Sequence, residues 1–126
     1  NATVFKNAAY GLKIRGLRKK DIEEKVEKIL EFVGLTDKKR HNALTLSSGE
    51  TQRLGIARAL VIEPEIIFLD EPTASIDEKN TGIVEEIILK INKQKGTTII
   101  MATHDVSQAK RLAGNILLMR EGTFLA

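Results

Sequence analysis

Ile66-Ile67-Phe68-Leu69-Asp70-Glu71 decides the fold, because four apolar residues run directly into two acids. A continuous apolar run of this length predicts a strand buried on both faces of a parallel sheet. Ligands of open α/β sheets bind outside the carboxyl ends of the strands, where Asp70 and Glu71 fall. One acid there can hold Mg²⁺ beside a nucleotide's phosphates, and the next can orient or deprotonate an attacking water. An ordinary exit from strand to loop is the alternative interpretation.

The residues downstream of this stretch alternate between helix and strand. Asp77 can cap a helix that ends at Gly96, and Thr97-Thr98-Ile99-Ile100-Met101 is a second apolar strand. This alternation predicts βαβ units and a parallel sheet, hence an α/β fold. Further elements are expected as a helix at about 106–112 and as strands at 115–119 and 123–125, around a turn at 121–122.

The residues upstream have the spacing of helices instead. Thr3 can cap a first helix that ends at Gly16, and a second helix is expected from about Lys20 to Val33, with Gly34 as its stop. A third helix is predicted from about Gly49 to Val61. A helical subdomain therefore precedes the sheet.

Composition restricts the functional classes only mildly. The 126 residues are 42% hydrophobic with a single Tyr and no Trp, so aliphatic side chains must build most of the core. The absence of cysteine excludes disulfides and thiolate metal sites. Basic residues cluster at 18–20 and 38–40 within a net charge of +3. We interpret both clusters as solvated loops or helix ends, with nucleic acid or acidic lipid binding as the alternative, and expect no nucleic acid partner.

Two further motifs carry polar groups that suit phosphate chemistry. Leu46-Ser47-Ser48-Gly49-Glu50 opens a helix, and its backbone N–H groups and helix dipole can bind an anion. A simple serine N-cap is the alternative. Thr103-His104-Asp105 follows the second strand, and His104 can be structural or can donate a hydrogen bond to a phosphate.

The order and spacing of these motifs resemble the ABC ATPase family over nearly the whole chain. The residues that carry the resemblance are Leu46–Glu50 with Gln52-Arg53 and Ala57-Arg58-Ala59-Leu60, Phe68-Leu69-Asp70-Glu71-Pro72-Thr73, Ala74-Ser75-Ile76-Asp77 and Ala102-Thr103-His104-Asp105.

The resemblance implies a role for each matching residue. Asp70 corresponds to the acid associated with Mg²⁺, Glu71 to the catalytic glutamate, and His104 to the switch histidine. The stretch around Ser47, Ser48, Gly49 and Glu50 is similar to the signature motif, which contacts the γ-phosphate of ATP held by a second subunit. Asp77 belongs to a loop that crosses the dimer interface in this family. The implied ligands are ATP and Mg²⁺.

The chain departs from the family pattern in several places, among them Glu50, where glutamine is common, and the missing glutamine-containing loop before the helical subdomain. Ser48 stands where the usual signature has glycine, which places a side chain near a phosphate contact. No G-x-x-x-x-G-K-[ST] motif occurs, so the phosphate-cradling loop is absent from these residues. We therefore expect an incomplete domain, with residues 1–45 as the helical subdomain. Residues 46–126 would hold the signature helix and the C-terminal part of a RecA-like P-loop sheet.

The compact helical insert and the early segment resemble the ATP-binding subunits of importers. The resemblance implies an ATPase at the cytoplasmic face of the membrane, working with a second ATPase subunit and with transmembrane permease subunits. The residues around Thr103–Ala113 resemble those of oxyanion importers of the tungstate and molybdate kind. A soluble ABC ATPase acting in translation or DNA repair is the alternative. The isolated chain is expected to be inactive. Because the strand at 97–101 lacks a neighbour, the chain is also expected to self-associate, to swap elements with another copy or to rearrange its C-terminal strands.

Overall fold

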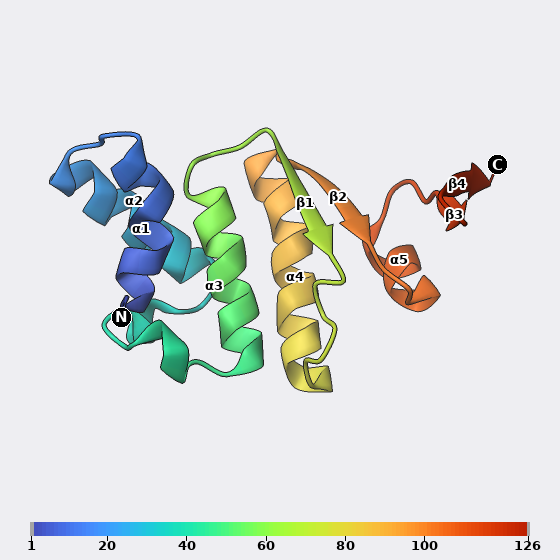
Figure 1. Ribbon diagram of the computed structural model, residues 1–126, viewed down its shortest axis with the longest axis horizontal. Coiled ribbons are helices and arrows are strands. Elements are labelled where there is room, and N and C mark those ends of the chain that lie inside the picture. The colour runs from blue at the N-terminus through green and yellow to red at the C-terminus, as the bar shows by residue number, and fades with distance from the viewer. Residues whose placement is uncertain (1, 126) are drawn as a thin grey trace.

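The computed structural model describes residues 2–125 as an elongated molecule, with helices at one end, a small sheet in the middle and a hairpin at the other end (Figure 1). The helices of the first part pack against one another before the chain enters the sheet. Their bounds are α1 Val4–Ile14, α2 Lys19–Phe32, the single-turn 3-10 helices η1 Thr36–Lys38 and η2 Ala43–Thr45, and α3 Ser48–Leu60.

Local signals explain where these helices begin and end. The Thr3 hydroxyl accepts a hydrogen bond from the backbone N–H of Lys6 at 3.1 Å and so caps α1. Gly34, just after α2, has a φ of +74°, a backbone conformation that glycine adopts without strain. The helices predicted at the start of the chain are therefore confirmed within one or two residues of their expected ends.

One hydrophobic core joins the helices to the sheet. It runs without a break from Val4 in α1 to Ile91 in α4, so packing marks no boundary at residue 45. Arg53 strengthens the junction, because its guanidinium donates to the carbonyl oxygens of Val33 and Gly34 at 2.9 and 3.1 Å. These bonds hold α3 against the C-terminal end of α2. The division into two subdomains stays a prediction.

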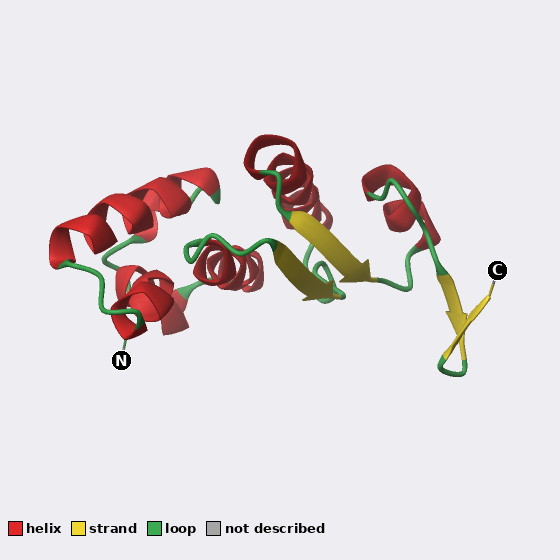
Figure 2. Cartoon of the chain, turned by 90° about the horizontal axis from the view of Figure 1, so that it is seen from above, coloured by secondary structure: helices red, strands yellow, loops and turns green. Residues whose placement is uncertain are grey.

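The sheet is the predicted βαβ unit. Strands β1 (Ile66–Asp70) and β2 (Thr98–Ala102) pair in parallel, and α4 (Glu78–Lys95) connects them. Figure 2 shows α4 lying along one side of the two strands. Asp77 caps α4 by accepting from the N–H of Asn80 at 2.8 Å, and Gly96 ends it with a φ of +67°. The α/β fold with a parallel sheet is confirmed.

The expectation that the first strand is buried on both faces is wrong for the residues described. Ile67 is 5% exposed and belongs to the hydrophobic core, whereas Phe68 and Ile66 on the opposite face are 75% and 49% exposed. The same alternation continues in β2, where Ile100 is 51% exposed. Within residues 2–125 the helix α4 covers only one face of the strands, and an apolar run cannot report which neighbours are present.

The chain ends in a helix packed on the sheet layer and a hairpin that projects away from the core. Helix α5 (Val106–Leu112) follows β2, and β3 (Leu118–Arg120) and β4 (Thr123–Leu125) form an antiparallel hairpin at the far end of Figure 1. The strand expected from residue 115 begins only at Leu118. Leu118 pairs with Leu125, the last residue of β4, so residues before it have no partner in the hairpin among those described.

A buried polar network fastens α5 to the rest of the sheet layer. Gln108 is 1% exposed, and its side-chain amide donates to Thr73 Oγ1 at 2.7 Å and to Glu85 Oε2 at 3.0 Å. Arg111 donates to both carboxylate oxygens of Glu85, at 3.2 and 2.8 Å. The network joins the loop after β1, helix α4 and helix α5 through four side chains.

The exposed apolar face of the sheet should make the 126-residue chain self-associate. Burying one large side chain contributes roughly 1.5–3 kcal/mol, so the double change Phe68→Thr and Ile100→Thr should weaken association by at least about tenfold. Threonine keeps the strand propensity. Sedimentation velocity measures the effect, with Leu44→Thr, 83% exposed on the helical part, as the control. Equal association of all three chains would contradict the prediction.

The Glu85 network should make stability depend on pH. Hydrogen bonds from Arg111, with help from Gln108, hold the pKa of the Glu85 carboxyl below its usual value. Its contribution is therefore fully present above the unfolded-state pKa, about 4.3, and is lost as the pH falls through the lower folded-state pKa. Glu85→Gln should cost roughly 1–3 kcal/mol at neutral pH, and this cost should shrink in acid.

Urea unfolding of the Phe68→Thr, Ile100→Thr chain measures this cost without interference from association. Glu86→Gln, which neutralises the exposed neighbour of Glu85, is the matched control and should change the free energy of unfolding little at any pH. A cost for Glu85→Gln that stays constant from neutral pH into acid would refute the assignment.

Candidate functional site

The carboxyl ends of β1 and β2 bring the first group of predicted residues together. Asp70 is the last residue of β1, is exposed, and pairs with Ala102 of β2. The backbone N–H of Glu71 donates to the carbonyl oxygen of Ala102 at 2.8 Å, so the parallel ladder continues one residue past the strand. His104 follows two residues after Ala102. The two segments therefore leave the sheet side by side.

Glu71 and His104 contact each other directly. The Nδ1 atom of His104 lies against Oε1 of Glu71, and the two form an ion pair when the imidazole is protonated. The His104 side chain is 96% exposed and that of Glu71 is 32% exposed. A carboxylate in this position can orient a water molecule or accept its proton, and the imidazole beside it can donate to an anion.

The backbone at Glu71 is unusual. Its φ of +46° is in the left-handed region, where a residue other than glycine is uncommon. Ser75 has a φ of +63°, and between them the chain turns tightly, with the N–H of Ala74 donating to the carbonyl oxygen of Glu71 at 3.1 Å. No residue type in this stretch indicates such a turn at Glu71. It is a feature that sequence reasoning missed.

The second group of predicted residues opens α3 with a capping box. The Ser47 hydroxyl accepts from the N–H of Glu50 at 3.2 Å, and the Glu50 carboxylate accepts from the N–H of Ser47 at 2.9 Å. The serine N-cap alternative is thus present in the structure. The Ser47 hydroxyl acts there as an acceptor, so its own proton is available for an anion.

The capping box also determines the state of Glu50. The backbone N–H of Ser47 holds the pKa of the Glu50 carboxyl below its usual value, and the charges of Lys38 and Arg53 act in the same direction. One oxygen of the carboxylate accepts the Ser47 N–H, and the other lies 3.8 Å from Lys38 Nζ. Glu50 is therefore engaged in holding the helix start, and of the neighbouring residues Ser47 and Ser48 are exposed whereas Gly49 is buried.

Gly49 connects this helix start to Asp77. A Cβ atom added at Gly49 would lie 2.7–2.8 Å from the side chain of Asn80, a clash that a real side chain cannot accept. Asn80 in turn donates to both carboxylate oxygens of Asp77, at 3.1 and 3.0 Å. Its backbone N–H is the main cause that lowers the pKa of Asp77. Two segments predicted separately are thus joined through Asn80, which sequence reasoning did not single out.

The two groups do not meet each other. Between residues 2 and 125, no hydrogen bond or ion pair links the start of α3 to Asp70, Glu71 or His104. The described residues also contain no cluster of three His, Cys, Asp or Glu side chains that could bind a metal ion by itself. Mg²⁺ usually takes one or two carboxylates and completes its shell with phosphate oxygens and water, so an exposed single carboxylate such as Asp70 fits this need.

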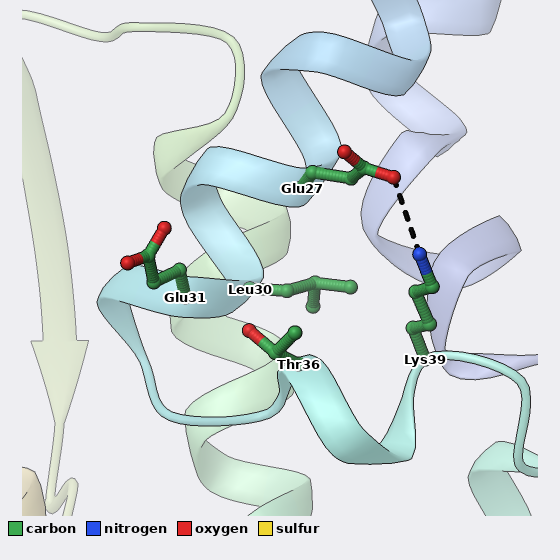
Figure 3. A pocket seen from close by; sticks show the side chains of 5 residues that line it. All are labelled: Glu27, Leu30, Glu31, Thr36 and Lys39. Carbon is green, nitrogen blue, oxygen red and sulfur yellow. Dashed lines mark hydrogen bonds and ion pairs between the residues drawn. The ribbon is translucent and has the colours of Figure 1, made fainter.

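Two hollows on the surface of residues 2–125 lie elsewhere. Figure 3 shows one on the helical part, lined by Glu27, Leu30, Glu31, Thr36 and Lys39, where Lys39 donates to Glu27 at 3.2 Å. A second, largely apolar one lies between α3 and β1, with Gln52, Ile62 and Phe68 among its lining residues. Neither contains a residue of the two predicted groups.

Sequence comparison identifies the family of the chain. Residues 1–74 match the family described as ABC transporter. The tungstate uptake system ATP-binding protein TupC of Peptoclostridium acidaminophilum is 42% identical over 95% of this chain and 56% of its own length. The methionine import ATP-binding protein MetN 4 of Oceanobacillus iheyensis is 40% identical over 96% of this chain and 35% of its own length. The chain thus spans about a third to a half of these relatives.

Solved structures agree with the sequence comparison. CbiO1 of Clostridium perfringens, part of the ABC transporter complex CbiONQ, superposes on 99% of this chain with a TM-score of 0.92 and 31% identity, over 50% of its own length. An inward-facing putative metal-chelate type ABC transporter covers 98% of the chain at a TM-score of 0.90, with 26% identity over 51% of its own length. The resemblance drawn from the motifs is confirmed: the chain belongs to the ABC transporter family.

Proposed function

We propose that the protein to which this chain belongs is an ATP-hydrolysing subunit that energises a membrane importer. The observation that carries the proposal is the contact between Glu71 and His104 beside Asp70, at the carboxyl ends of two adjacent parallel strands. In an ABC transporter family chain, this is where phosphoryl transfer needs an acid, a base and a hydrogen-bond donor. Relatives named for tungstate uptake and methionine import favour an importer over a soluble ATPase of translation or repair.

Each residue at the strand ends has a distinct proposed role. Asp70 would hold Mg²⁺, which supplies charge neutralisation at the phosphates when bound. Glu71 would orient the attacking water and accept its proton, since its carboxylate is partly exposed. His104 would donate a hydrogen bond to the transferred phosphate while the contact with Glu71 fixes the imidazole. The phosphate-cradling motif is not among these 126 residues, so its donors would come from outside them.

Ser47, Ser48 and Gly49 would act on the nucleotide of a second ATPase subunit. Their separation from the strand ends within residues 2–125 supports a site completed by a partner, because one chain alone does not join the two groups. The N-terminus of α3 offers backbone N–H groups to a phosphate. Asp77, which holds Asn80 against Gly49, would lie at the same interface.

The remaining partners follow from the importer proposal. No helix described in the structure has the length and apolar character needed to cross a membrane. The subunit would work at the cytoplasmic face with transmembrane permease subunits, and no nucleic acid is proposed. The solute would be a small one such as an oxyanion, as the relative of tungstate uptake suggests. The solute is tested by measuring tungstate uptake and methionine uptake separately, in cells that lack the gene and in the same cells after the gene is restored.

Glu71→Gln in the intact subunit should slow ATP hydrolysis by about 10²–10⁴-fold, the usual effect of losing acid–base help. ATP binding should survive, because the amide keeps the shape and removes a charge near the phosphates. Phosphate release under saturating MgATP measures the loss, with equilibrium binding of the nucleotide beside it. Glu65→Gln, which removes the same charge at the other end of β1, is the control and should hydrolyse normally.

Asp70→Asn separates the metal role from the base role in the same assay. It should weaken Mg²⁺-dependent nucleotide binding, whereas Glu71→Gln should not. Turnover within about twofold of wild type for both variants would show that neither role is assigned correctly.

Ser48→Asp should abolish hydrolysis only at the nucleotide of the partner. Aspartate suits the first turn of a helix, and Ser48 is exposed, so α3 should stay folded while the new charge repels a phosphate. A crosslinked dimer of a Ser48→Asp subunit and a Glu71→Gln subunit should keep one intact composite site. Its single-turnover hydrolysis should reach about half of the wild-type amplitude, as the one-site count requires.

The matched control is a crosslinked dimer of one wild-type subunit and one subunit that carries both Ser48→Asp and Glu71→Gln. If Ser48 acts on the partner's nucleotide, this control has both sites damaged and should show almost no burst. The opposite result, an active control and an inactive mixed dimer, would place Ser48 and Glu71 in the same site and overturn the arrangement.

A further inference from the structure

Gln108 is a buried polar side chain outside the predicted site. It is 1% exposed, and burying an amide is costly unless its groups find partners. Both amide protons do, one on Thr73 Oγ1 at 2.7 Å and one on Glu85 Oε2 at 3.0 Å. An amide is suited to this place because both neighbours accept and the amide nitrogen donates twice.

The Glu85 carboxylate that accepts from Gln108 is itself held in place. Arg111, three residues after Gln108 on α5, donates to both oxygens of the Glu85 carboxylate, which is 13% exposed. A bidentate, partly buried pair of this kind fixes the carboxylate in angle as well as distance. The hydrogen bond from Gln108 therefore ends on a charged and rigid acceptor, and α4 and α5 are fastened together.

Thr73 connects the hydrogen bonds of Gln108 to Glu71. Only Pro72 separates the two residues, and Pro72 is fully buried with its φ restricted by the ring. The N–H of Ala74 donates back to the carbonyl oxygen of Glu71 at 3.1 Å, and Glu71 itself has a φ of +46°. Such a short and constrained link passes any displacement of Thr73 on to Glu71.

The backbone of Gln108 is bonded to the segment that carries His104. Its N–H donates to the side chain of Asp105 at 3.1 Å, and the N–H of Asp105 donates to Thr103 Oγ1 at 3.1 Å. These two residues flank His104, whose own side chain is 96% exposed and has little packing to hold it. Gln108 thus bonds to both segments whose side chains meet at the strand ends.

We propose that Gln108 is a positioning residue that sets Glu71 against His104, by tying the loop after β1 and the start of α5 to the fixed carboxylate of Glu85. The inference rests on the proposed function, since it assigns to Gln108 the geometry in which Glu71 works. A misplacement of about 1 Å at a reacting group can cost about a hundredfold in rate, so the effect is measurable.

The test uses the intact subunit and the change Gln108→Leu, which keeps the bulk and removes both hydrogen bonds. The turnover number kcat should fall by about 10–100-fold while KM for ATP stays within about twofold, because binding does not need the Glu71–His104 geometry. Amide exchange of residues 71–76, followed in protein without nucleotide, should become faster. Thr73→Val breaks the same bond from the other side and carries the test if Gln108→Leu fails to fold.

Changes that keep the shape but alter the hydrogen bonds distinguish positioning from general support of the fold. Gln108→Glu keeps the size of the side chain, places a second carboxylate beside Glu85 and should lower kcat as Gln108→Leu does. Thr73→Ser keeps the hydroxyl that accepts from Gln108, so its kcat should stay within about threefold of wild type, unlike that of Thr73→Val. A folded Thr73→Ser variant that loses kcat as Thr73→Val does would count against the proposal.

Asn92→Leu is the matched control for lost stability. The Asn92 amide donates to the carbonyl oxygen of Thr97 at 3.2 Å and fastens the other end of α4, away from Glu71. It should lower the melting temperature and leave kcat unchanged. If Gln108→Leu lowers the melting temperature as much but keeps kcat within about twofold, Gln108 is only structural and the proposal is overturned.

Failure of the proposed function would give a different result from failure of the positioning role. A wild-type subunit that hydrolyses no ATP would sink that function, and amide exchange would then decide the positioning role alone. Unchanged exchange of residues 71–76 in both Gln108→Leu and Thr73→Val would overturn it.

Discussion

The hydrogen bonds that pair β1 with β2 in parallel hold every proposed catalytic group of this chain at one edge of the sheet. Parallel strands need a crossover between them, and α4 supplies it while covering one face. Because the register ends with Asp70 opposite Ala102, the next residues of both strands leave at the same level. The extra bond from Glu71 to Ala102 extends this order into the loops, and His104 then lies within reach of Glu71. A shift of register by one residue would separate the pair.

A second constraint couples the helix that bears the signature stretch to the start of α4. Gly49 leaves room for Asn80, and Asn80 is held by three hydrogen bonds to Asp77. The start of α3 and the start of α4 therefore form one packed unit, with α4 attached directly to the sheet.

Features that depend on neighbours in the chain were predictable, and features that depend on distant contacts were not. The side chains of Thr3 and Asp77 each accept a hydrogen bond from a backbone N–H three residues later, so local spacing alone indicated both helix starts. The exposure of Phe68 depends on what lies across the sheet face, which an apolar run does not record. The bond of Gln108 to Thr73 spans 35 positions, and no local pattern marks either residue. The candidate acids were predictable because a strand end is a local signal. The contacts that position them join residues far apart in the sequence and were not predictable.

The departure of the signature from its usual form now has a physical interpretation. Ser48 is the first residue of α3 and is exposed, so its side chain points into solvent without disturbing the packing of the helix start. Gly49 is buried, and a Cβ atom there would clash with Asn80. Of these two neighbouring positions, only position 49 must be glycine for the fold of this chain. The serine at the first position is therefore compatible with the folded structure, and its hydroxyl adds a donor on the surface where the proposed partner's phosphate would bind.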